Sequence, residues 1–351
     1  MELILDKQFA SAIEHMSEGV CITDPRLPDN PIVYVNPGFT QLTGYTAEEA
    51  LGKNCRFLQS ENTDTTSIDK IRHAIQRQAS VTSVLLNRHK NGSLFWNELR
   101  VNPVTNEHGE LIHYVGVQTD VTTRIEAKRD MSLAAKVQRT MLPTSTENSH
   151  FCLETIYQPH SFISGDCYDY YWDEEKKILS GYLFDIMGHG VATALQSSAL
   201  RVLFEQASKK KLSLADKLAW VNDACLPYLA DEYFFAAICF EMDFSQGMLR
   251  YAVGGVNYFL AERDRRHEMI GTPGMFLGIF EGMRFKEECI PFAKGDAFYF
   301  FSDGLYEKMP YPFTYEQRNF DETVHWLKAL SQEPKRKDDV SALCIHVKEG
   351  N

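Results

Sequence analysis

The segment from residue 120 to residue 142 constrains the fold most, because it lacks glycine and proline and is rich in charged, helix-favouring residues. Such a segment predicts one continuous helix, which Pro143 ends. On both sides, short β-favouring runs alternate with turn signals. The chain has 351 residues, 44% of them apolar, which is enough for two cores. The sequence therefore predicts an α+β protein with domains at 8–120 and 144–349, joined by a linker helix at 121–143.

The linker also carries a weak heptad seam. Its 4-3-4-3 spacing is made by Ala127, Met131, Ala134, Gln138 and Met141. Two of these residues are small and one is polar, which weakens the pattern. Because such a seam buries apolar surface only against a partner, it predicts a homodimer through the linker helix. An ordinary amphipathic linker is the alternative, and the sequence leaves both open.

The first domain is expected to be an antiparallel sheet with helices on one face. Thr46 is a predicted N-cap, and Glu49 is placed to complete a capping box. The Asn-Gly pair at 91–92 and the His-Gly pair at 108–109 predict hairpin turns. Strands are expected at 20–23, 32–35, 81–88, 94–104 and 111–120, and helices at 39–45, 46–51 and 67–78.

The second domain is also rich in strands, and two long helical stretches interrupt them. Strands are expected at 178–185, 234–243, 247–253, 297–302 and 340–347, and helices at 191–206 and 214–228. This order predicts an antiparallel sheet or β-sandwich flanked by α-helices.

Composition narrows the classes of partner. The formal net charge of −12 repels nucleic acid and anionic lipid, so neither is expected as a partner. No stretch approaches the roughly 20 apolar residues of a membrane span. The N-terminal residues show no secretory signal pattern, so a cytoplasmic location is expected. The eight cysteines include no CxxC pair, and most are expected to be small buried hydrophobic residues.

Cys55 has unusual neighbours in the sequence, because amide and guanidinium side chains surround its thiol. The segment from Gly52 to Gln59 packs this thiol between amides and a guanidinium. The planar fork of Arg56 suits a phosphate, and Arg72 offers a second. Five carboxamides, each with a donor and an acceptor, can contact a flat heterocycle with mixed polar edges. They are Asn54, Gln59, Asn87, Asn97 and Gln118, and the last three alternate along three successive strands.

Residues 8–120 closely resemble a LOV domain, a blue-light sensor of the PAS fold. The resemblance rests on the Asn-Cys-Arg-Phe-Leu-Gln core at 54–59, the segment at 23–31, and the Gly-Val-Gln triplet at 116–118. It implies bound FMN, with Cys55 forming a light-induced thioether to the ring and Arg56 and Arg72 holding the phosphate. The five carboxamides would contact the ring or the ribityl chain. A flavin-free PAS domain, or a Cys55 that senses redox state, are the alternatives.

We hypothesise that Gln118 passes the light-induced change from the flavin ring to the linker helix. A thioether at the ring leaves the neighbouring nitrogen protonated, so an acceptor there becomes a donor. Gln118 can rotate its amide so that its oxygen accepts from the protonated nitrogen, because one end of a carboxamide accepts hydrogen bonds and the other donates them. Since Gln118 lies just before the linker, its rotation is expected to bias the helix between two arrangements.

Aspartates beside glycines mark the ends of predicted strands in the second domain. They occur at 165–166, 185–190, 303–304 and 338–339. One such pair is an ordinary turn signal, but four that follow or end apolar runs predict converging carboxylates. Carboxylates without thiol or histidine partners favour Mg²⁺ or Mn²⁺. Two such ions clamp a phosphate and activate a bridging water, so no nucleophilic serine or cysteine is needed.

Residues 130–349 resemble the SpoIIE-like branch of the metal-dependent protein phosphatases, the PPM family. The matching motifs lie at 137–143, 164–169, 185–195, 302–307 and 338–341. The resemblance implies two Mn²⁺ or Mg²⁺ ions, with Asp185 bridging them. Further ligands would be Asp166, Asp303, Asp338, the carbonyl of Ile186 and, as a weaker candidate, Asp339. His189 is either a general acid or a turn residue. Ser164 and the 254–257 segment depart from the family pattern, whereas every carboxylate of the pattern is present.

Together the two resemblances imply a light-regulated protein serine/threonine phosphatase. The catalytic residues would be Asp166, Asp185, Asp303 and Asp338. The family implies a phosphorylated anti-sigma-factor antagonist as the substrate. The alternatives are a metal-free pseudophosphatase or a light-gated binding protein whose second domain holds a partner without hydrolysis. The sequence does not give the sign of the light response.

Overall fold

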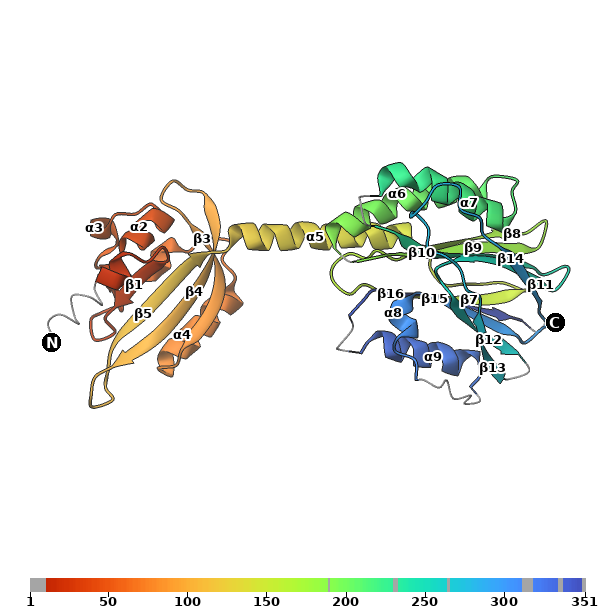
Figure 1. The fold of residues 1–351 in the computed structure, drawn as a ribbon. Helices are drawn as coiled ribbons and strands as arrows, with labels where there is room; N and C mark the ends of the chain where they lie inside the picture. Colours follow the sequence, from red (N-terminus) through yellow and green to blue (C-terminus); the bar gives the residue numbers. More distant parts are fainter. Residues whose placement is uncertain are drawn as a thin grey trace. The chain divides into compact units, whose positions relative to one another are not determined.

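A computed structural model describes residues 11–188, 190–229, 233–263, 266–310, 318–333 and 337–348. The chain divides into two compact units, Met1–Asp130 and Met131–Asn351. The division falls inside helix α5 (Thr122–Met141), the predicted linker helix, which connects them in the chain (Figure 1). The two units are described separately below.

The first unit is built on one five-stranded antiparallel sheet with the order β2-β1-β5-β4-β3. The five predicted strands are confirmed, with boundaries that differ by at most one residue. Central strand β1 pairs with β2 on one side and with the C-terminal strand β5 on the other. The strands are β1 (Gly19–Thr23), β2 (Ile32–Val35), β3 (Val81–Arg88), β4 (Leu94–Thr105) and β5 (Leu111–Asp120).

Helices of the first unit begin where side chains cap them. Thr46 caps α3 (Ala47–Ala50) with the predicted Glu49 capping box. Helix α2 (Pro37–Thr43) begins two residues before its predicted start, because Asn36 caps it and Pro37 suits the first turn. The short 3-10 helix η1 (Cys55–Leu58) and helix α4 (Thr65–Gln76) complete the set. The hairpin turns at 91–92 and 108–109 are confirmed, with positive φ at both glycines.

The second unit contains two antiparallel sheets, with the orders β14-β11-β10-β9-β8 and β13-β12-β15-β16-β7-β6. The predicted strands at 178–185, 234–243, 247–253, 297–302 and 340–347 correspond to β9, β10, β11, β15 and β16. The full set is β6 (Thr146–Glu147), β7 (Phe151–Gln158), β8 (Cys167–Asp173), β9 (Ile178–Ile186), β10 (Phe235–Asp243), β11 (Met248–Gly254), β12 (Tyr258–Arg263), β13 (Arg266–Gly271), β14 (Glu287–Pro291), β15 (Ala297–Phe301) and β16 (Val340–Val347).

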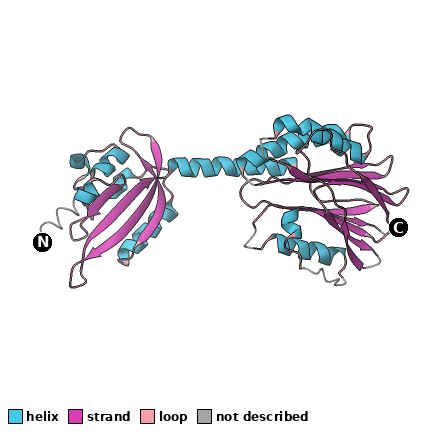
Figure 2. Ribbon diagram, in the orientation of Figure 1, coloured by secondary structure: helices cyan, strands magenta, loops and turns pink. Residues whose placement is uncertain are grey.

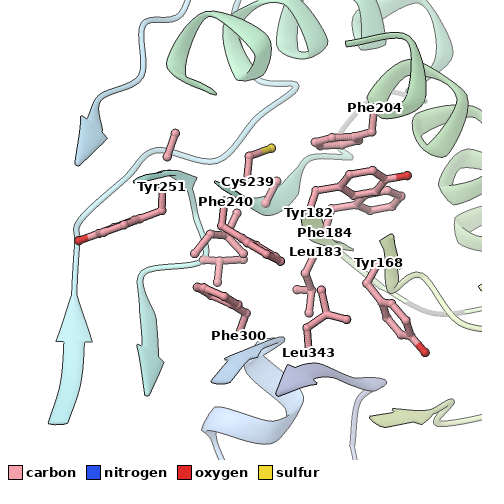
Figure 3. Close-up of a cluster of buried hydrophobic side chains, with 14 of the residues drawn as sticks. Tyr168, Tyr182, Leu183, Phe184, Phe204, Cys239, Phe240, Tyr251, Phe300 and Leu343 are labelled. Carbon is pink, nitrogen blue, oxygen red and sulfur yellow. The ribbon is translucent and has the colours of Figure 1, made fainter. Parts of the chain in front are cut away.

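These two sheets form a β-sandwich, as the order of elements predicted. Phe240 of β10 stacks on Phe300 of β15 with ring centroids 4.5 Å apart, and both rings are fully buried (Figure 3). Helices α6 (Val191–Ser208) and α7 (Leu214–Cys225) flank the first sheet, and α8 (Asp303–Tyr306) and α9 (Phe320–Ser331) flank the second (Figure 2). This stacked pair belongs to one core cluster that contains buried residues of both sheets.

Some elements differ from the prediction. The helix expected at 214–228 ends at Cys225 and continues as a 3-10 turn, Leu226–Tyr228, because Pro227 has no backbone N–H to continue the α-helical pattern. Strands β7, β8, β12, β13 and β14 and helix α9 were not predicted individually. Strand β7 pairs with the distant β16, which no local pattern shows, whereas β8 pairs with the next strand β9 and β12 pairs with the next strand β13.

Helix α5 has no buried residue between Thr122 and Met141, all of which are described. Met131 and Met141 of the predicted seam are exposed. Gln138, however, bonds within its own chain, as described below, so this member of the seam is not free for a partner helix. Within the described residues, no helix combines the length and apolarity that crossing a membrane requires.

Candidate functional site

The first unit holds a cavity of about 560 Å³ between its sheet and the η1–α4 segment. All eight residues that the sequence predicted to contact a flavin line this cavity. They are Asn54, Cys55, Arg56, Gln59, Arg72, Asn87, Asn97 and Gln118. The sequence therefore located the lining of the cavity correctly, while their contacts with a cofactor remain a prediction.

Strand register brings three of the carboxamides to one face of the sheet. Asn87 lies on β3, Asn97 on β4 and Gln118 on β5, and each is at most 3% exposed. Alternate residues of a strand share a face, so the spacing along paired strands decides which side chains meet. Asn97 Nδ2 donates to Gln118 Oε1 at 3.0 Å. The three amides thus form a polar floor for the cavity.

Two oxygens of this floor have no hydrogen-bond partner in the part of the chain that is described. They are Oδ1 of Asn87 and Oδ1 of Asn97, and both are buried. A buried acceptor without a donor costs about 1–3 kcal/mol. The residues therefore fit a flat ligand that presents N–H donors at its edge, as the isoalloxazine ring of a flavin does.

The two predicted phosphate-binding arginines lie at the solvent side of the cavity. Arg56 Nη1 donates to both carboxylate oxygens of Asp29 at 2.7 Å, and Arg72 pairs with Asp69. Both arginines are about 60% exposed, so these ion pairs are weak and an anion can displace the carboxylates. Asn54 has a second role, because its Oδ1 caps η1 by accepting from Arg56 N at 3.1 Å.

Cys55 is accompanied by a second thiol that the sequence did not single out. Cys21 Sγ lies 3.7 Å from Cys55 Sγ, and Gln118 Nε2 donates to Cys21 Sγ at 3.6 Å. The contact with Cys55 and the bond from Gln118 lower the pKa of Cys21, whereas the same contact and burial raise the pKa of Cys55 well above its usual value. Its position on a cavity-facing strand was the only available signal for Cys21.

In the second unit, the predicted carboxylates lie at strand ends of both sheets. Asp166 precedes β8 and Asp185 lies near the end of β9, whereas Asp303 begins α8 after β15 and Asp338 precedes β16. Asp166 is buried, Asp185 is half-buried and Asp303 is exposed. The group therefore runs from the interior of the sandwich to its surface.

Close backbone approach joins the motifs of this carboxylate site. A Cβ added at Gly165 would lie 3.0 Å from the carbonyl oxygen of Ile186, which places the first two motifs side by side. A Cβ at Gly304 would lie 2.0 Å from the carbonyl oxygen of Asp339, so only glycine fits there. These two glycines allow the four strand-end segments to converge.

Each carboxylate of this site disfavours the ionised form of its neighbours. Burial and the neighbouring Asp339 raise the pKa of Asp166 to about 7. Burial, Asp166 and Asp303 raise the pKa of Asp185 well above its usual value. Burial also raises the pKa of Asp338. Like charges in a low-dielectric site disfavour ionisation, and a bound cation would reverse this effect.

The donor set fits hard divalent ions. Neither carboxylate oxygen of Asp166 has a hydrogen-bond partner among the described residues, although the side chain is 1% exposed. In the same part of the chain, no three His, Cys, Asp or Glu side chains form a closed metal-binding group. Asp185 instead approaches Asp166 and Asp303 pairwise. The residues thus supply uncompensated oxygen ligands that cations would draw together.

Asp339 already has partners for both of its oxygens. Oδ1 accepts from His160 N at 2.6 Å, and Oδ2 accepts from Gly165 N at 2.8 Å. The side chain therefore anchors the loop before Asp166 to the start of β16. This arrangement favours Asp338 over Asp339 as a metal ligand, which agrees with the ranking from the sequence.

Gln138 of α5 holds the same loop from the other side. Its Nε2 donates to Ser164 O at 2.7 Å, and its Oε1 accepts from Ser164 N at 3.0 Å and from Tyr157 Oη at 2.9 Å. Ser164 Oγ in turn accepts from Asp166 N at 3.0 Å. The sequence placed Gln138 in the heptad seam and in the phosphatase-like motif at 137–143, but it did not predict these hydrogen bonds, which correct the seam assignment. His189 lies outside the described residues.

Comparison with known families agrees with this geometry. Residues 17–123 match the model of the PAS domain, and residues 179–349 match that of Stage II sporulation protein E (SpoIIE). The chain joins a LOV-like PAS domain to a SpoIIE-family phosphatase domain. The PAS domain and the antiparallel sandwich confirm the predicted fold class.

Relatives of the chain include blue-light receptors. A blue-light photoreceptor of Listeria monocytogenes is 43% identical over 136 residues, which cover 38% of this chain and 53% of the relative. A blue-light-activated histidine kinase of Brucella anthropi is 47% identical over 117 residues, 33% of this chain and 24% of the relative. Phototropin-2 of Oryza sativa is 42% identical over 138 residues, 39% of this chain and 15% of the relative. The chain thus spans about half or less of these relatives.

Proposed function

We propose that this chain is a blue-light-regulated, metal-dependent protein serine/threonine phosphatase. The observation that carries the proposal is the presence, on one chain, of a cavity suited to a flavin and a buried carboxylate site suited to divalent ions. The family matches support the same pairing of a light sensor with a phosphatase.

In the light-sensing unit, the cavity would hold FMN. The flavin supplies blue-light absorption and a ring carbon to which the Cys55 thiol can bond. The chain's own residues would orient it: Asn87, Asn97 and Gln118 would contact the ring edge, and Arg56 and Arg72 would bind the phosphate in place of their carboxylate partners. Asn54 holds η1, and with it Cys55, in place by capping the helix.

In the phosphatase unit, two Mn²⁺ or Mg²⁺ ions would supply a clamp for phosphate and an activated water. Asp185 would be the central ligand, and Asp166, Asp303, Asp338 and the carbonyl of Ile186 would be the further ligands. Asp339 would act on the site through its carboxylate, which accepts from His160 N and Gly165 N and so fixes the loop that carries Asp166.

Helix α5 would carry the light signal. At its start, Thr122 Oγ1 accepts from Trp96 N at 2.8 Å, and Trp96 is the neighbour of Asn97, which bonds to Gln118. Near its end, Gln138 bonds to both backbone groups of Ser164. A change at Gln118 that shifts α5 would therefore reach the loop of Asp166 through hydrogen bonds and one continuous helix.

The substrate would be a phosphorylated protein. Resemblance to the SpoIIE-like phosphatases supports a phosphorylated anti-sigma-factor antagonist, in the cytoplasm. The exposed Met131 and Met141 support a homodimer through the linker helix, in which Gln138 remains bonded to its own chain.

Two measurements on the purified chain test this function. We expect its visible spectrum to bleach under blue light and recover in the dark, and Cys55→Ala to abolish the bleaching. We also expect Mn²⁺-dependent release of phosphate from a phosphoserine protein. A chain that binds flavin but does not bleach, or that releases no phosphate with Mn²⁺ present, contradicts the proposal.

The pairwise arrangement of the carboxylates favours one second candidate, a light-gated binding protein with a non-catalytic phosphatase-like unit. Such a protein would bind a phosphorylated partner under light control and leave the phosphate in place. Metal-dependent turnover separates the two functions, because only the phosphatase releases phosphate.

A further inference from the structure

Two thiols touch in the wall of the flavin cavity, and the proposed photochemistry needs only one of them. Cys21 and Cys55 are both free, both line the cavity, and their sulfur atoms are 3.7 Å apart. They lie 34 positions apart in the sequence, on strand β1 and helix η1. Folding therefore brings this pair together, and no short cysteine motif in the sequence indicates it.

The sheet keeps Cys21 in a fixed position. Its register partner on β5 is Gly116, and a Cβ at Gly116 would lie 2.8 Å from Cys21 Sγ. Glycine therefore leaves the room that the thiol occupies. Gln118 Nε2 contacts the same sulfur at 3.6 Å. Cys21 is 2% exposed, so the cavity is its route to small molecules.

Cys55 is placed to close the remaining distance. It is the first residue of a four-residue 3-10 helix. A disulfide requires a sulfur–sulfur distance of about 2.05 Å, so the two atoms must approach from 3.7 Å. Rotation of one cysteine side chain together with a small shift of this short helix provides such a movement.

We propose that Cys21 and Cys55 form a reversible disulfide when peroxide enters the flavin-free cavity, and that this bond removes Cys55 from the photoreaction. The inference rests on the proposed light-sensing function and adds a modification site to it. Oxidation would hold the chain in a light-insensitive state until a thiol reductant restores both cysteines.

The chemistry has defined roles for the two sulfurs. The bond from Gln118 and the contact with Cys55 lower the pKa of Cys21, so Cys21 is the thiol that ionises first. Its thiolate attacks one peroxide oxygen, forming a sulfenic acid and releasing hydroxide. The Cys55 thiol then attacks the Cys21 sulfur and expels a second hydroxide. With the two thiol protons, these hydroxides give two waters, and one peroxide is reduced per disulfide.

Flavin would protect the pair. The ligand would occupy the same cavity that exposes both sulfurs, so peroxide would reach them slowly in the loaded protein. The disulfide would therefore form in chains that have lost their cofactor. Gln118 would also lose its sulfur contact when Cys21 turns toward Cys55.

The test treats the full chain with hydrogen peroxide in the dark, with and without bound FMN. After alkylation, peptide mass spectrometry measures the fraction in which the Cys21 and Cys55 peptides are joined with the loss of two hydrogens. We expect joining in the flavin-free chain, at least about tenfold slower joining in the loaded chain, and full reversal by dithiothreitol. Reloading the oxidised chain with FMN should give a flavin that bleaches only in proportion to the reduced fraction.

Variants make the outcome decisive. Cys21→Val should leave bleaching intact after peroxide treatment, with Cys21→Ser as a second variant if the valine does not fold. Cys289→Ser removes an exposed thiol and should change nothing. Equal loss of bleaching in wild type and Cys21→Val, or oxidised Cys55 beside a reduced Cys21, would overturn the inference. The mass measurement is made in the dark, so it stands even if the reduced chain fails to bleach and the proposed light sensing fails.

Discussion

The flavin cavity and the carboxylate site differ in how they are prepared for a ligand. The floor of the cavity is made of neutral amides, and two of its oxygens have no donor among the residues that the structure describes. The carboxylate site is made of like charges that raise one another's pKa values. Neutral groups can be set in place by strand register alone, whereas converging carboxylates oppose the fold until cations arrive. The cavity is preformed, whereas the carboxylate site would be completed by bound cations.

The largest expected effect is at Asp185. We expect Asp185→Asn to lower Mn²⁺-dependent turnover at least about a hundredfold, because it removes the carboxylate that we propose as the central metal ligand. In the metal-free chain the same change should raise the free energy of unfolding by about 1 kcal/mol, since it removes a charge that burial, Asp166 and Asp303 disfavour. Phosphate release and thermal unfolding measure the two effects.

The exposed Asp321, outside the site, provides the matched control, Asp321→Asn. It should change neither the Mn²⁺-dependent turnover nor the increase in the free energy of unfolding that bound Mn²⁺ gives. If Asp185→Asn destabilises the metal-free chain, the contrast between the two sites is wrong.

The next effect tests the amide floor. Asn97→Leu removes a buried acceptor and the donor to Gln118, so the flavin dissociation constant should rise about ten- to hundredfold. Fluorescence titration of the flavin-free chain measures it. Asn102→Leu makes the same change at an exposed position on the same strand and should leave affinity unchanged. An unaltered affinity in Asn97→Leu would mean that the floor does not contact the ligand.

The next prediction concerns Gln138, whose hydrogen bonds join helix α5 to the loop that carries Asp166. Gln138→Leu removes three hydrogen bonds to Ser164 and Tyr157, so the Mn²⁺ concentration for half-maximal activity should rise about tenfold. The ratio of lit to dark activity should fall toward one, while bleaching of the flavin stays normal. Lys136→Leu, at an exposed position on the same helix, is the control. A normal light response in Gln138→Leu would place the coupling elsewhere.

The smallest effect is at the mouth of the cavity. Asp29→Asn frees Arg56 from an exposed ion pair, which is worth no more than about 1 kcal/mol. FMN should then bind a few times more tightly, whereas riboflavin, which lacks the phosphate, should bind as before. Parallel titrations with the two flavins measure this, and an equal change for both would exclude Arg56 as a phosphate ligand.

The two sites also differ in how far the sequence predicts them. Seven of the eight predicted residues follow from a dense local motif at 54–59 and from period-two alternation on three consecutive strands. Arg72 was predicted separately, as a second phosphate-binding arginine in the helical stretch at 67–78, and all eight line the cavity. Cys21 was missed because a cysteine in a strand looks like any small buried residue. Its importance comes from contact with a residue 34 positions away.

In the second unit, the Asp-Gly motifs marked the carboxylates but not their supports. The bonds from Asp339 to His160 and Gly165 span more than 170 positions, and no local pattern announces them. Gln138 was assigned by its heptad spacing to the seam, yet its side chain bonds to Ser164. Periodicity predicts the face of a helix on which a residue lies. It does not predict the hydrogen-bond partner of a polar side chain such as that of Gln138.

We propose that light at Cys55 controls metal-dependent hydrolysis in the other unit. The most direct measurement is the rate of phosphate release from a phosphoserine protein by the full chain, in darkness and under blue light, with and without Mn²⁺. We predict a rate that requires Mn²⁺ and changes with light in the wild type, and a rate that requires Mn²⁺ but ignores light in Cys55→Ala. Equal wild-type rates in darkness and light would contradict the account.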